Sequence, residues 1–336
     1  MTGLALLACA RGSDGGGCTG EIAPGARLSC SAPGDAARPY TLVLPGDLPA
    51  GRAVPLLLVL HGGGGRPESA ETMTCPDGRA DHPDCLANLG RREGFASVFP
   101  SGVSGPHFAR LRTWNAGGGV GDWQCVSGAA CREGSDDVAY LRRVVADVAG
   151  RLPVDRRRIY AAGLSNGAAM SHRLACEAAD LFAAIVAVGG GNQLAAAQGC
   201  APVRPVAVLQ VHGSADPCWP YEGGTGACLQ RDGKRKVGVA ETLAGWATRN
   251  GCGAPPREEA LPDLADDGMR TTRIRWPGCR AGGDVVLLRI EGGGHAWPDG
   301  HQYLPARLVG RPTRDFGNSL LWRFLADHPM RASEAP

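Results

Sequence analysis

The chain has 336 residues, of which 43% are hydrophobic and 20% are charged. This composition predicts a globular protein with a packed core and argues against intrinsic disorder. The net charge is only +2, from 35 basic and 33 acidic residues. The charge therefore gives no electrostatic reason to expect a nucleic acid or an anionic membrane as a partner.

The N-terminal segment resembles an export signal. Residues 4–8 are a short apolar run with a small residue before Cys9, a pattern typical of bacterial lipoprotein signals. We interpret residues 1–9 as a signal-like segment with a truncated start, and Cys9 as a candidate lipidation site. No other apolar stretch approaches the ~20 residues needed to span a bilayer. We therefore expect an exported protein, extracellular or at the cell surface, with no transmembrane span and with Cys9 as a candidate lipid anchor.

The next part of the chain predicts a lead-in and the first strands. Residues 10–35 are rich in Gly, Ser and Pro, which predicts a flexible, irregular lead-in. Apolar residues alternate over 40–44, which predicts an edge strand. The continuous apolar run 54–60 predicts a strand buried on both faces, and 95–99 predicts another short strand.

From Ser135 onward, the sequence predicts alternating helices and strands. Ser135 is the expected N-cap of a helix whose apolar residues recur at helical spacing up to Leu152. Further strands are expected over 159–162, 183–188, 206–211 and 285–290, and further helices over 168–178, 239–250 and 318–326. This alternation predicts an α/β fold, with a mostly parallel central sheet and helices on both faces. A single domain over 36–330 is expected.

The thirteen cysteines indicate a disulfide-rich protein from an oxidising compartment. They do not form Cys-x-x-Cys pairs beside histidines, so a zinc site is not expected. Without Cys9, twelve cysteines remain, and they form close sequential couples. Spacing alone leaves the connectivity open. The preferred pairs are Cys18–Cys30, Cys75–Cys85, Cys125–Cys131, Cys176–Cys200, Cys218–Cys228 and Cys252–Cys279.

A nucleophile elbow is predicted at Gly163-Leu164-Ser165-Asn166-Gly167. In such an elbow a serine sits on a sharp strand-to-helix turn, and the flanking glycines allow the backbone to pack tightly around it. The five-residue pattern is weak alone, because glycine is common in this chain. An apolar strand before it and an amphipathic helix after it make Ser165 the candidate nucleophile.

An oxyanion hole is predicted from the glycine-rich segment that follows the first buried strand. Esterases and lipases place such a segment before the elbow. Backbone N–H groups of Gly63 or Gly64, together with that of Asn166, are the candidate donors. The alternative is a flexible loop without chemistry, and the sequence leaves open which glycine donates.

Two further residues after strands complete a predicted Ser-His-Asp triad. Asp216 follows one strand and can orient a histidine and stabilise its charged form. His295 lies on a glycine-rich loop after the last strand and can exchange a proton with Ser165. The chain order Ser, Asp, His is that of α/β-hydrolases. His212 competes as a functional residue, although a histidine at a strand end is more often structural.

These motifs resemble the polyhydroxybutyrate depolymerase family, which also includes feruloyl and acetylxylan esterases. The resemblance covers residues 36–330. It implies an α/β-hydrolase fold, a secreted catalytic domain, a Ser165–Asp216–His295 triad and no cofactor. Gly63 stands where many relatives have a cysteine, which leaves the oxyanion donor open. The segments that carry the resemblance are 60–65, 113–117, 136–138, 163–171, 212–216 and 292–298.

The substrate is the least determined part of this prediction. Side chains beside the motifs that are expected to contact it are His61, Trp114, Trp219 and Trp297, since aromatic walls suit a polyester, a cinnamoyl ring or a sugar. We expect an ester hydrolase that cleaves short-chain hydroxyalkanoate polyester or its oligomers. The alternative is a feruloyl or acetylxylan esterase acting on plant cell-wall polysaccharide. A serine peptidase and a non-catalytic surface-binding lipoprotein are weaker alternatives. No metal-ligand spacing and no phosphate-binding loop is present, so no metal and no cofactor are expected.

Overall fold

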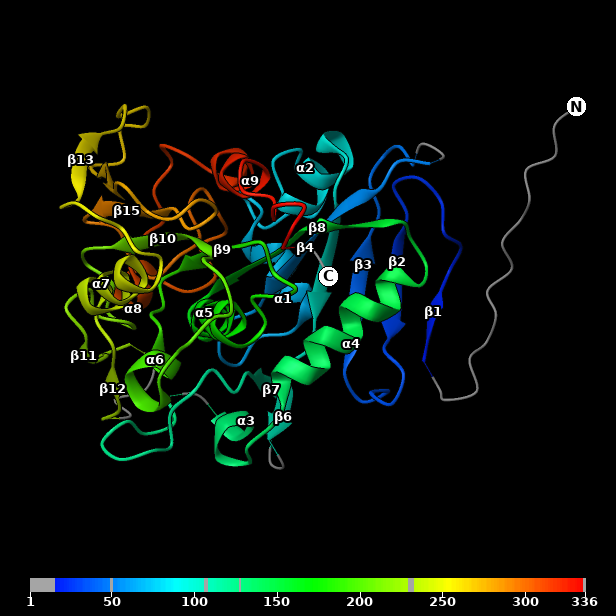
Figure 1. Ribbon diagram of the computed structural model, residues 1–336, viewed down its shortest axis with the longest axis horizontal. Coiled ribbons are helices and arrows are strands. Elements are labelled where there is room, and N and C mark those ends of the chain that lie inside the picture. The colour runs from blue at the N-terminus through cyan, green and yellow to red at the C-terminus, as the bar shows by residue number, and fades with distance from the viewer. Residues whose placement is uncertain (1–15, 49–50, 106–107, 127, 229–232, 335–336) are drawn as a thin grey trace, which may run out of the picture.

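The computed structural model describes residues 16–48, 51–105, 108–126, 128–228 and 233–334, so the signal-like segment and Cys9 lie outside the described residues. Within them, one large sheet has the strand order β1-β2-β3-β5-β4-β8-β9-β10-β15-β14-β13 (Figure 1). Its strands are β1 (Gly17–Thr19), β2 (Arg27–Ser31), β3 (Pro39–Val43), β4 (Val54–Leu60), β5 (Ala96–Pro100), β8 (Val154–Leu164), β9 (Ala184–Val188), β10 (Ala207–Gly213), β13 (Arg257–Ala260), β14 (Arg270–Trp276) and β15 (Val285–Glu291). Two small hairpins pair β6 (Val103–Gly105) with β7 (Phe108–Thr113), and β11 (Gly224–Thr225) with β12 (Arg235–Lys236).

The six central strands, from β5 to β15, run parallel, and the strands on either flank are antiparallel. β4 is buried along its whole length, as expected for a strand covered on both faces. The predicted parallel sheet is therefore confirmed, with antiparallel additions at its edges.

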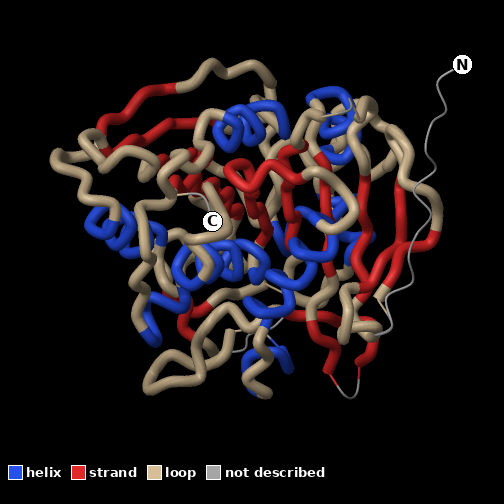
Figure 2. Tube along the Cα trace, turned by 45° about the vertical axis from the view of Figure 1, so that its right-hand side comes forward, coloured by secondary structure: helices blue, strands red, loops and turns tan. Residues whose placement is uncertain are grey.

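Helices cover both faces of the sheet and form two separate cores (Figures 1 and 2). Leu56 and Leu58 of β4 pack with apolar residues of α4, α5 and α7, while Leu57 and Val59 face those of α1, α2 and α9. This alternation follows from the two-residue period of a strand. The helices are α1 (Pro67–Met73), α2 (Leu86–Glu93), α3 (Gly128–Arg132), α4 (Asp137–Ala149), α5 (Asn166–Glu177), α6 (Gln193–Gln198), α7 (Val239–Arg249), α8 (Ala306–Val309) and α9 (Asn318–Ala326). Every helix among the described residues is too short or too polar to traverse a bilayer.

The expected irregular lead-in over 10–35 is wrong at residues 17–19 and 27–31, which form strands. β1 and β2 add two antiparallel strands to the sheet, and Leu28 and Cys30 of β2 are buried on one face. The disulfide between Cys18 and Cys30 joins the two strands directly opposite one another. The abundance of glycine and proline masked this short alternation of buried residues.

The expected edge strand at 40–44 is also corrected. β3 lies inside the sheet, between β2 and β5. At the other edge, β13 and β14 extend the sheet beyond β15, which is therefore not the outermost strand. β14 was missed because its sequence, Arg270–Trp276, is rich in arginine and threonine, and only Thr271 and Ile274 are buried.

Twelve cysteines form six disulfides, and these are the six pairs preferred from the sequence. Each closes a loop of the chain, so each restricts the unfolded state. The shortest separation, six residues, belongs to Cys125–Cys131, and the longest, 27 residues, to Cys252–Cys279. The bonds are therefore expected to stabilise the fold unequally.

Replacing both cysteines of a pair by alanine tests this expectation. By loop entropy, loss of Cys252–Cys279 should lower the free energy of unfolding by about 3.5 kcal/mol, and loss of Cys125–Cys131 by about 2 kcal/mol. Urea unfolding of the two variants and the parent protein measures both values. An equal or larger cost for the shorter loop would contradict the expectation.

Candidate active site

The loops singled out by the sequence meet at one edge of the sheet. His61 follows β4, Ser165 follows β8, Asp216 follows β10 and His295 follows β15. These strands are parallel and, with β9 among them, are neighbours in the sheet. Their carboxyl ends therefore lie side by side, at the edge where open α/β sheets bind ligands.

Ser165 occupies a sharp turn between β8 and α5. Its φ is 59° and its ψ is −118°, a backbone region that few residues other than glycine adopt. An ideal Cβ on Gly163 would lie 2.4 Å from the backbone of Gly167, and one on Gly167 would lie 2.3 Å from the carbonyl oxygen of Leu60. Both glycines are therefore required by close backbone packing, as predicted for a nucleophile elbow.

Asp216 and His295 are joined by a hydrogen bond of 2.7 Å between Oδ2 and Nδ1. The other carboxylate oxygen, Oδ1, accepts the N–H groups of Cys218 and Trp219, each at 2.8 Å. Burial opposes ionisation of the carboxyl group. The interactions with His295 and His212 and the bond from the Trp219 amide nevertheless hold the pKa of Asp216 below its usual value. Asp216 is therefore suited to orient an imidazole and to stabilise its charged form.

The loop after β9 contacts both Ser165 and His295. An ideal Cβ on Gly190 would lie 2.3 Å from the carbonyl oxygen of Ser165, and one on Gly189 would lie 3.0 Å from Nδ1 of His295. Two consecutive residues thus touch the two groups, which brings Ser165 into the neighbourhood of the Asp216–His295 pair. Since Nδ1 of His295 is bonded to Asp216, Nε2 is the nitrogen left to exchange a proton.

The candidate oxyanion donors differ in their availability. The N–H of Gly64 donates to the carbonyl of Arg112 at 2.8 Å, so it is already bonded within the backbone. The prediction that Gly64 donates to an oxyanion is therefore wrong. An ideal Cβ on Gly63 would lie 3.8 Å from Cβ of Asn166, which places Gly63 directly beside the start of α5. The first N–H groups of a helix have no partner within it, so the Asn166 amide remains a candidate donor.

The Asn166 side chain fastens the elbow to a neighbouring loop. Its Oδ1 accepts the N–H of Trp114 at 2.7 Å, and its Nδ2 donates to the Trp114 carbonyl at 3.0 Å. The Trp114 indole N–H donates to the carbonyl of His61 at 2.9 Å. One tryptophan therefore bridges the expected oxyanion loop and the elbow.

Four side chains expected to contact substrate do not face a cleft. His61 is fully buried, accepts the N–H of Gly102 on Nε2 and lies 2.8 Å from the Gly62 carbonyl through Nδ1. The indoles of Trp114, Trp219 and Trp297 are also buried. A side chain with almost no accessible surface cannot touch substrate. The predicted substrate contacts of these four residues are therefore wrong, and their side chains have structural roles. The tryptophans are 0%, 2% and 1% exposed, and their indole N–H groups donate to the His61 carbonyl, the Val237 carbonyl and Asn318 Oδ1.

Two exposed apolar side chains lie beside the site instead. Leu111 is 51% exposed, and its Cδ2 lies 3.6 Å from an ideal Cβ on Gly64. Tyr303 is 37% exposed, and its hydroxyl donates to the His295 carbonyl at 3.0 Å. Sequence reasoning missed both residues, because neither lies within a recognised motif.

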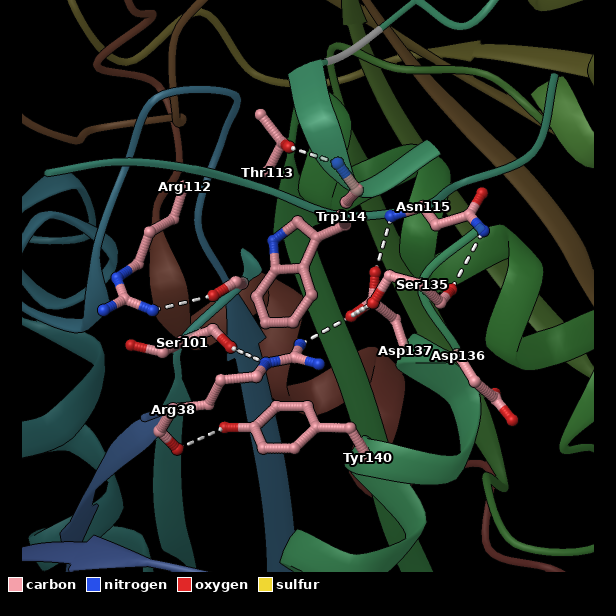
Figure 3. Close-up of polar contacts among 12 residues, drawn as sticks. Arg38, Ser101, Arg112, Thr113, Trp114, Asn115, Ser135, Asp136, Asp137 and Tyr140 are labelled. Atoms are coloured by element: carbon pink, nitrogen blue, oxygen red, sulfur yellow. Dashed lines mark hydrogen bonds and ion pairs between the residues drawn. The ribbon is translucent and has the colours of Figure 1, made fainter. Parts of the chain in front are cut away.

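A buried ion pair supports the Trp114 loop (Figure 3). The Arg38 guanidinium lies between the rings of Trp114 and Tyr140, 5.8 Å and 3.5 Å from their centres. It bonds to Oδ1 of the fully buried Asp137 at 2.5 Å. Oδ2 of Asp137 accepts the N–H of Asn115 at 2.6 Å, which holds the residue next to Trp114. Asp137 and Val138 are thus buried at the start of α4, whereas the exposed Asp136, and not the expected Ser135, is the N-cap and accepts the N–H of Ala139.

A group of potential metal ligands among the described residues coincides with the site. Ligand atoms of Asp216, Cys218 and His295 lie within 4.8 Å of one another. However, Cys218 is bonded to Cys228, so its sulfur cannot act as a thiolate ligand. The carboxylate and the imidazole are bonded to one another. This cluster therefore fits an acid–histidine pair better than a metal centre.

Further polar residues beneath the site were missed by sequence reasoning. Gln210 stands inside the buried strand β10 and bonds to both His172 and His212. A polar residue in an otherwise apolar strand was the available signal. His172 and its partner Trp246 lie on two different helices, and no local pattern connects them.

Comparisons with known proteins identify relatives among esterases. No family model matches the chain. "Putative esterase NocK" from Nocardia uniformis is 33% identical over 279 residues, which cover 81% of this chain and 73% of that protein. Feruloyl esterase B from Piromyces equi is 29% identical over 216 residues, which cover 64% of this chain and 36% of that protein. The solved acetyl xylan esterase from Aspergillus awamori matches with a TM-score of 0.51 over 77% of this chain and 89% of its own; at 15% identity this likeness concerns the fold alone.

The buried histidines predict a loss of stability in mild acid. Burial lowers the pKa of His61 and of His172 to about 4, whereas the unfolded side chains titrate near 6.5. Between these values the unfolded state binds more protons, so the free energy of unfolding falls as the pH decreases. His328, whose pKa is raised chiefly by Asp284 against the effect of burial, acts in the opposite direction.

Chemical unfolding at pH 7 and at pH 5 measures this effect. We expect the free energy of unfolding to be lower at pH 5 by a few kcal/mol. The loss from the buried histidines exceeds the gain from the single partly buried His328–Asp284 pair. The variant His328→Gln should lose still more. A free energy of unfolding that stays level or rises on acidification would refute the prediction.

Removal of the buried charge at Asp137 should destabilise the protein. Asp137→Asn leaves Arg38 without its anionic partner and turns an amide N–H toward the Arg38 guanidinium or the Asn115 N–H, which are themselves donors. The substitution should lower the free energy of unfolding by about 3–5 kcal/mol. The matched control is Asp180→Asn, which breaks an ion pair with Arg142 whose side chains are 51% and 36% exposed. It should cost less than about 1 kcal/mol. Thermal and urea unfolding compare the two, and equal costs would count against the support assigned to Asp137.

Proposed function

The chain belongs to a family of α/β-hydrolase carboxylic ester hydrolases that includes feruloyl esterases, and we propose that it is a Ser-His-Asp esterase acting on feruloyl or acetyl esters of plant cell-wall polysaccharide. The observation that carries the proposal is the 2.7 Å bond between Asp216 and His295 at the sheet edge that bears the strained Ser165. The relatives favour this substrate class over the hydroxyalkanoate polyester expected first from the sequence.

In the proposed reaction Ser165 is the nucleophile. Its Oγ attacks the ester carbonyl carbon while Nε2 of His295 takes the hydroxyl proton. The protonated imidazole then donates that proton to the departing alcohol oxygen, and the acyl group remains on Ser165. Water, activated in turn by His295, releases the acid and restores the serine. Asp216 holds the imidazole through Nδ1 in both halves of the reaction.

The backbone N–H groups of Gly63 and Asn166 are assigned the role of stabilising the negative charge that develops on the carbonyl oxygen. One such donor contributes about 3 kcal/mol of barrier lowering. Trp114 supports both, because it binds the side chain of Asn166 and the carbonyl before the glycines. A rigid donor pair needs no rearrangement when the charge develops.

The apolar side chains of Leu111 and Tyr303 are assigned to the walls of the site. They are exposed beside the oxyanion loop and the histidine, where an acyl or aromatic group would lie. A cinnamoyl ring offers a flat apolar face that suits such walls. This supports a feruloyl ester as the first substrate to test.

Export is part of the proposal. Six disulfides favour an oxidising compartment, since such bonds rarely persist in the cytosol. Lipidation of Cys9 remains a prediction. The catalytic domain is proposed to include residues 17–31 as well as 36–330, because β1 and β2 belong to its sheet.

Ser165→Ala should abolish hydrolysis of p-nitrophenyl butyrate, with a fall in kcat of at least about a thousandfold. The wild-type protein should react with a fluorophosphonate probe, and the variant should not. Ser319→Ala, at an exposed serine on α9, is the matched control and should behave as wild type. An active Ser165→Ala variant would falsify the assignment.

A substrate panel separates the ester classes. Methyl ferulate, acetylated xylan and polyhydroxybutyrate oligomers are compared by kcat/KM on one preparation. We expect methyl ferulate or acetylated xylan to be preferred. A higher kcat/KM on the polyhydroxybutyrate oligomers would overturn the substrate proposal and leave the esterase chemistry intact.

A further inference from the structure

A chain of buried polar side chains leads from α7 to the proposed catalytic carboxylate. Trp246, His172, Gln210 and His212 are each 1% exposed or less, and consecutive members are hydrogen-bonded at 3.0 Å. They come from α7, α5 and β10, so the chain crosses the core beneath the active site. None of them contacts substrate in the proposed reaction.

The first link fixes the protons of His172. An indole N–H can only donate, and Nε1 of Trp246 donates to Nδ1 of His172. Nδ1 is therefore an acceptor, and the proton of this neutral imidazole must be on Nε2. The Nε2 proton is donated to Oε1 of Gln210 at 3.0 Å, which determines the orientation of that amide.

The second link fixes the protons of His212. With Oε1 of Gln210 turned to His172, its Nε2 donates to Nδ1 of His212 at 3.0 Å and to the Gly190 carbonyl at 2.9 Å. Nδ1 of His212 is thus an acceptor, so its proton is on Nε2. That Nε2–H donates to the Trp219 carbonyl at 2.9 Å and lies 3.5 Å from Oδ2 of Asp216.

We propose that His212 is a positioning residue for Asp216, and that the Trp246–His172–Gln210 chain holds His212 in the tautomer that turns an N–H toward the carboxylate. The proposal rests on the proposed function, in which Asp216 orients His295. Burial lowers the pKa of His212 despite the nearby carboxylate. The imidazole is therefore neutral at neutral pH. A neutral donor stabilises the carboxylate without becoming a second charged partner that competes with His295.

The opposite tautomer would be unfavourable at both ends. A lone pair on Nε2 of His212 would face the Trp219 carbonyl and the Asp216 carboxylate, which are both acceptors. To reach that state, Gln210 must turn over and His172 must move its proton to Nδ1, where the Trp246 N–H already points. The Trp246 indole can only donate, and the carbonyls of Gly190 and Trp219 can only accept, so these groups together fix the direction of every bond in the chain.

The same chain also supports the nucleophile turn. Gln210 holds the Gly190 carbonyl, and Gly190 packs against the carbonyl of Ser165. The peptide groups of the Cys218–Trp219 segment bind Asp216 and His212 together, since Trp219 donates to the carboxylate and accepts from the imidazole. His212 thus connects the acid loop to the strand beneath it.

Nitrogen-15 NMR of histidine-labelled protein tests the tautomers directly. At neutral pH the rings of His172 and His212 should each carry a proton on Nε2 and a bare Nδ1; the signals are assigned by their loss in His172→Gln and His212→Gln. In Trp246→Phe, a signal for His172 protonated on Nδ1 should appear. A wild-type His212 protonated on Nδ1, or unchanged His172 and His212 signals in Trp246→Phe, would overturn the proposal.

Kinetics tests the consequence for catalysis. His212→Leu removes the N–H and should lower kcat by about tenfold or more with little change in KM, because Asp216 does not touch substrate. His212→Gln places an amide N–H near the Nε2 position and should keep kcat within about threefold of wild type. His328→Gln, which removes a partly buried histidine bonded to Asp284, is the matched control and should leave kcat unchanged.

The outcomes separate this proposal from the proposed function. If Ser165→Ala is inactive while His212→Leu keeps the wild-type kcat, the positioning role is wrong and the triad stands. If Ser165→Ala remains active, the triad is wrong, and the role given to His212 falls with it even where the NMR tautomers are as expected. Should His212→Leu fail to fold, a kcat for Trp246→Phe equal to that of wild type would itself refute the proposal.

Discussion

The contact between the elbow and the end of β4 constrains the whole site. Gly167 lies against the carbonyl of Leu60 so closely that a single methyl group would not fit. The start of α5 and the start of the glycine-rich loop after β4 are therefore parts of one packed backbone unit. The strained φ of Ser165 costs of the order of 1–3 kcal/mol, which the surrounding structure must offset. Its N–H bond to Val188 and the buried face of α5 supply that support.

Buried polar networks flank this unit on two sides. One is the Arg38–Asp137 pair beneath Trp114, and the other is the chain from Trp246 to His212. Burying such groups costs free energy unless each donor and acceptor is paired. These networks fix the positions of the loops, because hydrogen bonds are directional whereas apolar packing alone would allow several loop arrangements. The six disulfides stabilise the fold around them and offset part of that cost.

The sequence predicted the parts of the fold that have strong local periodicity. The buried run of β4 and the helical spacing of α4 were identified from the pattern of apolar residues alone. The catalytic candidates Ser165, Asp216 and His295 were found because each follows such a strand. In contrast, β1 and β14 escaped prediction, because β1 has only three residues and β14 is rich in arginine and threonine, so neither shows a clear apolar period; both are defined by pairing with the strands next to them in sequence. The tautomer chain joins residues far apart in sequence, and its order exists only in the folded protein.

The position of the aromatic residues shows why sequence proximity to a motif is a poor guide to substrate contact. Trp297 lies two residues from His295, yet its indole is buried and bonded to Asn318. Large rings beside glycine-rich loops fill the space that glycine leaves, so they order the loop from beneath. The surface above such a loop is then formed by residues from other segments, here Leu111 and Tyr303. Under the proposed function, specificity is therefore expected to depend on those segments, while the buried rings hold the loops around Ser165, Asp216 and His295.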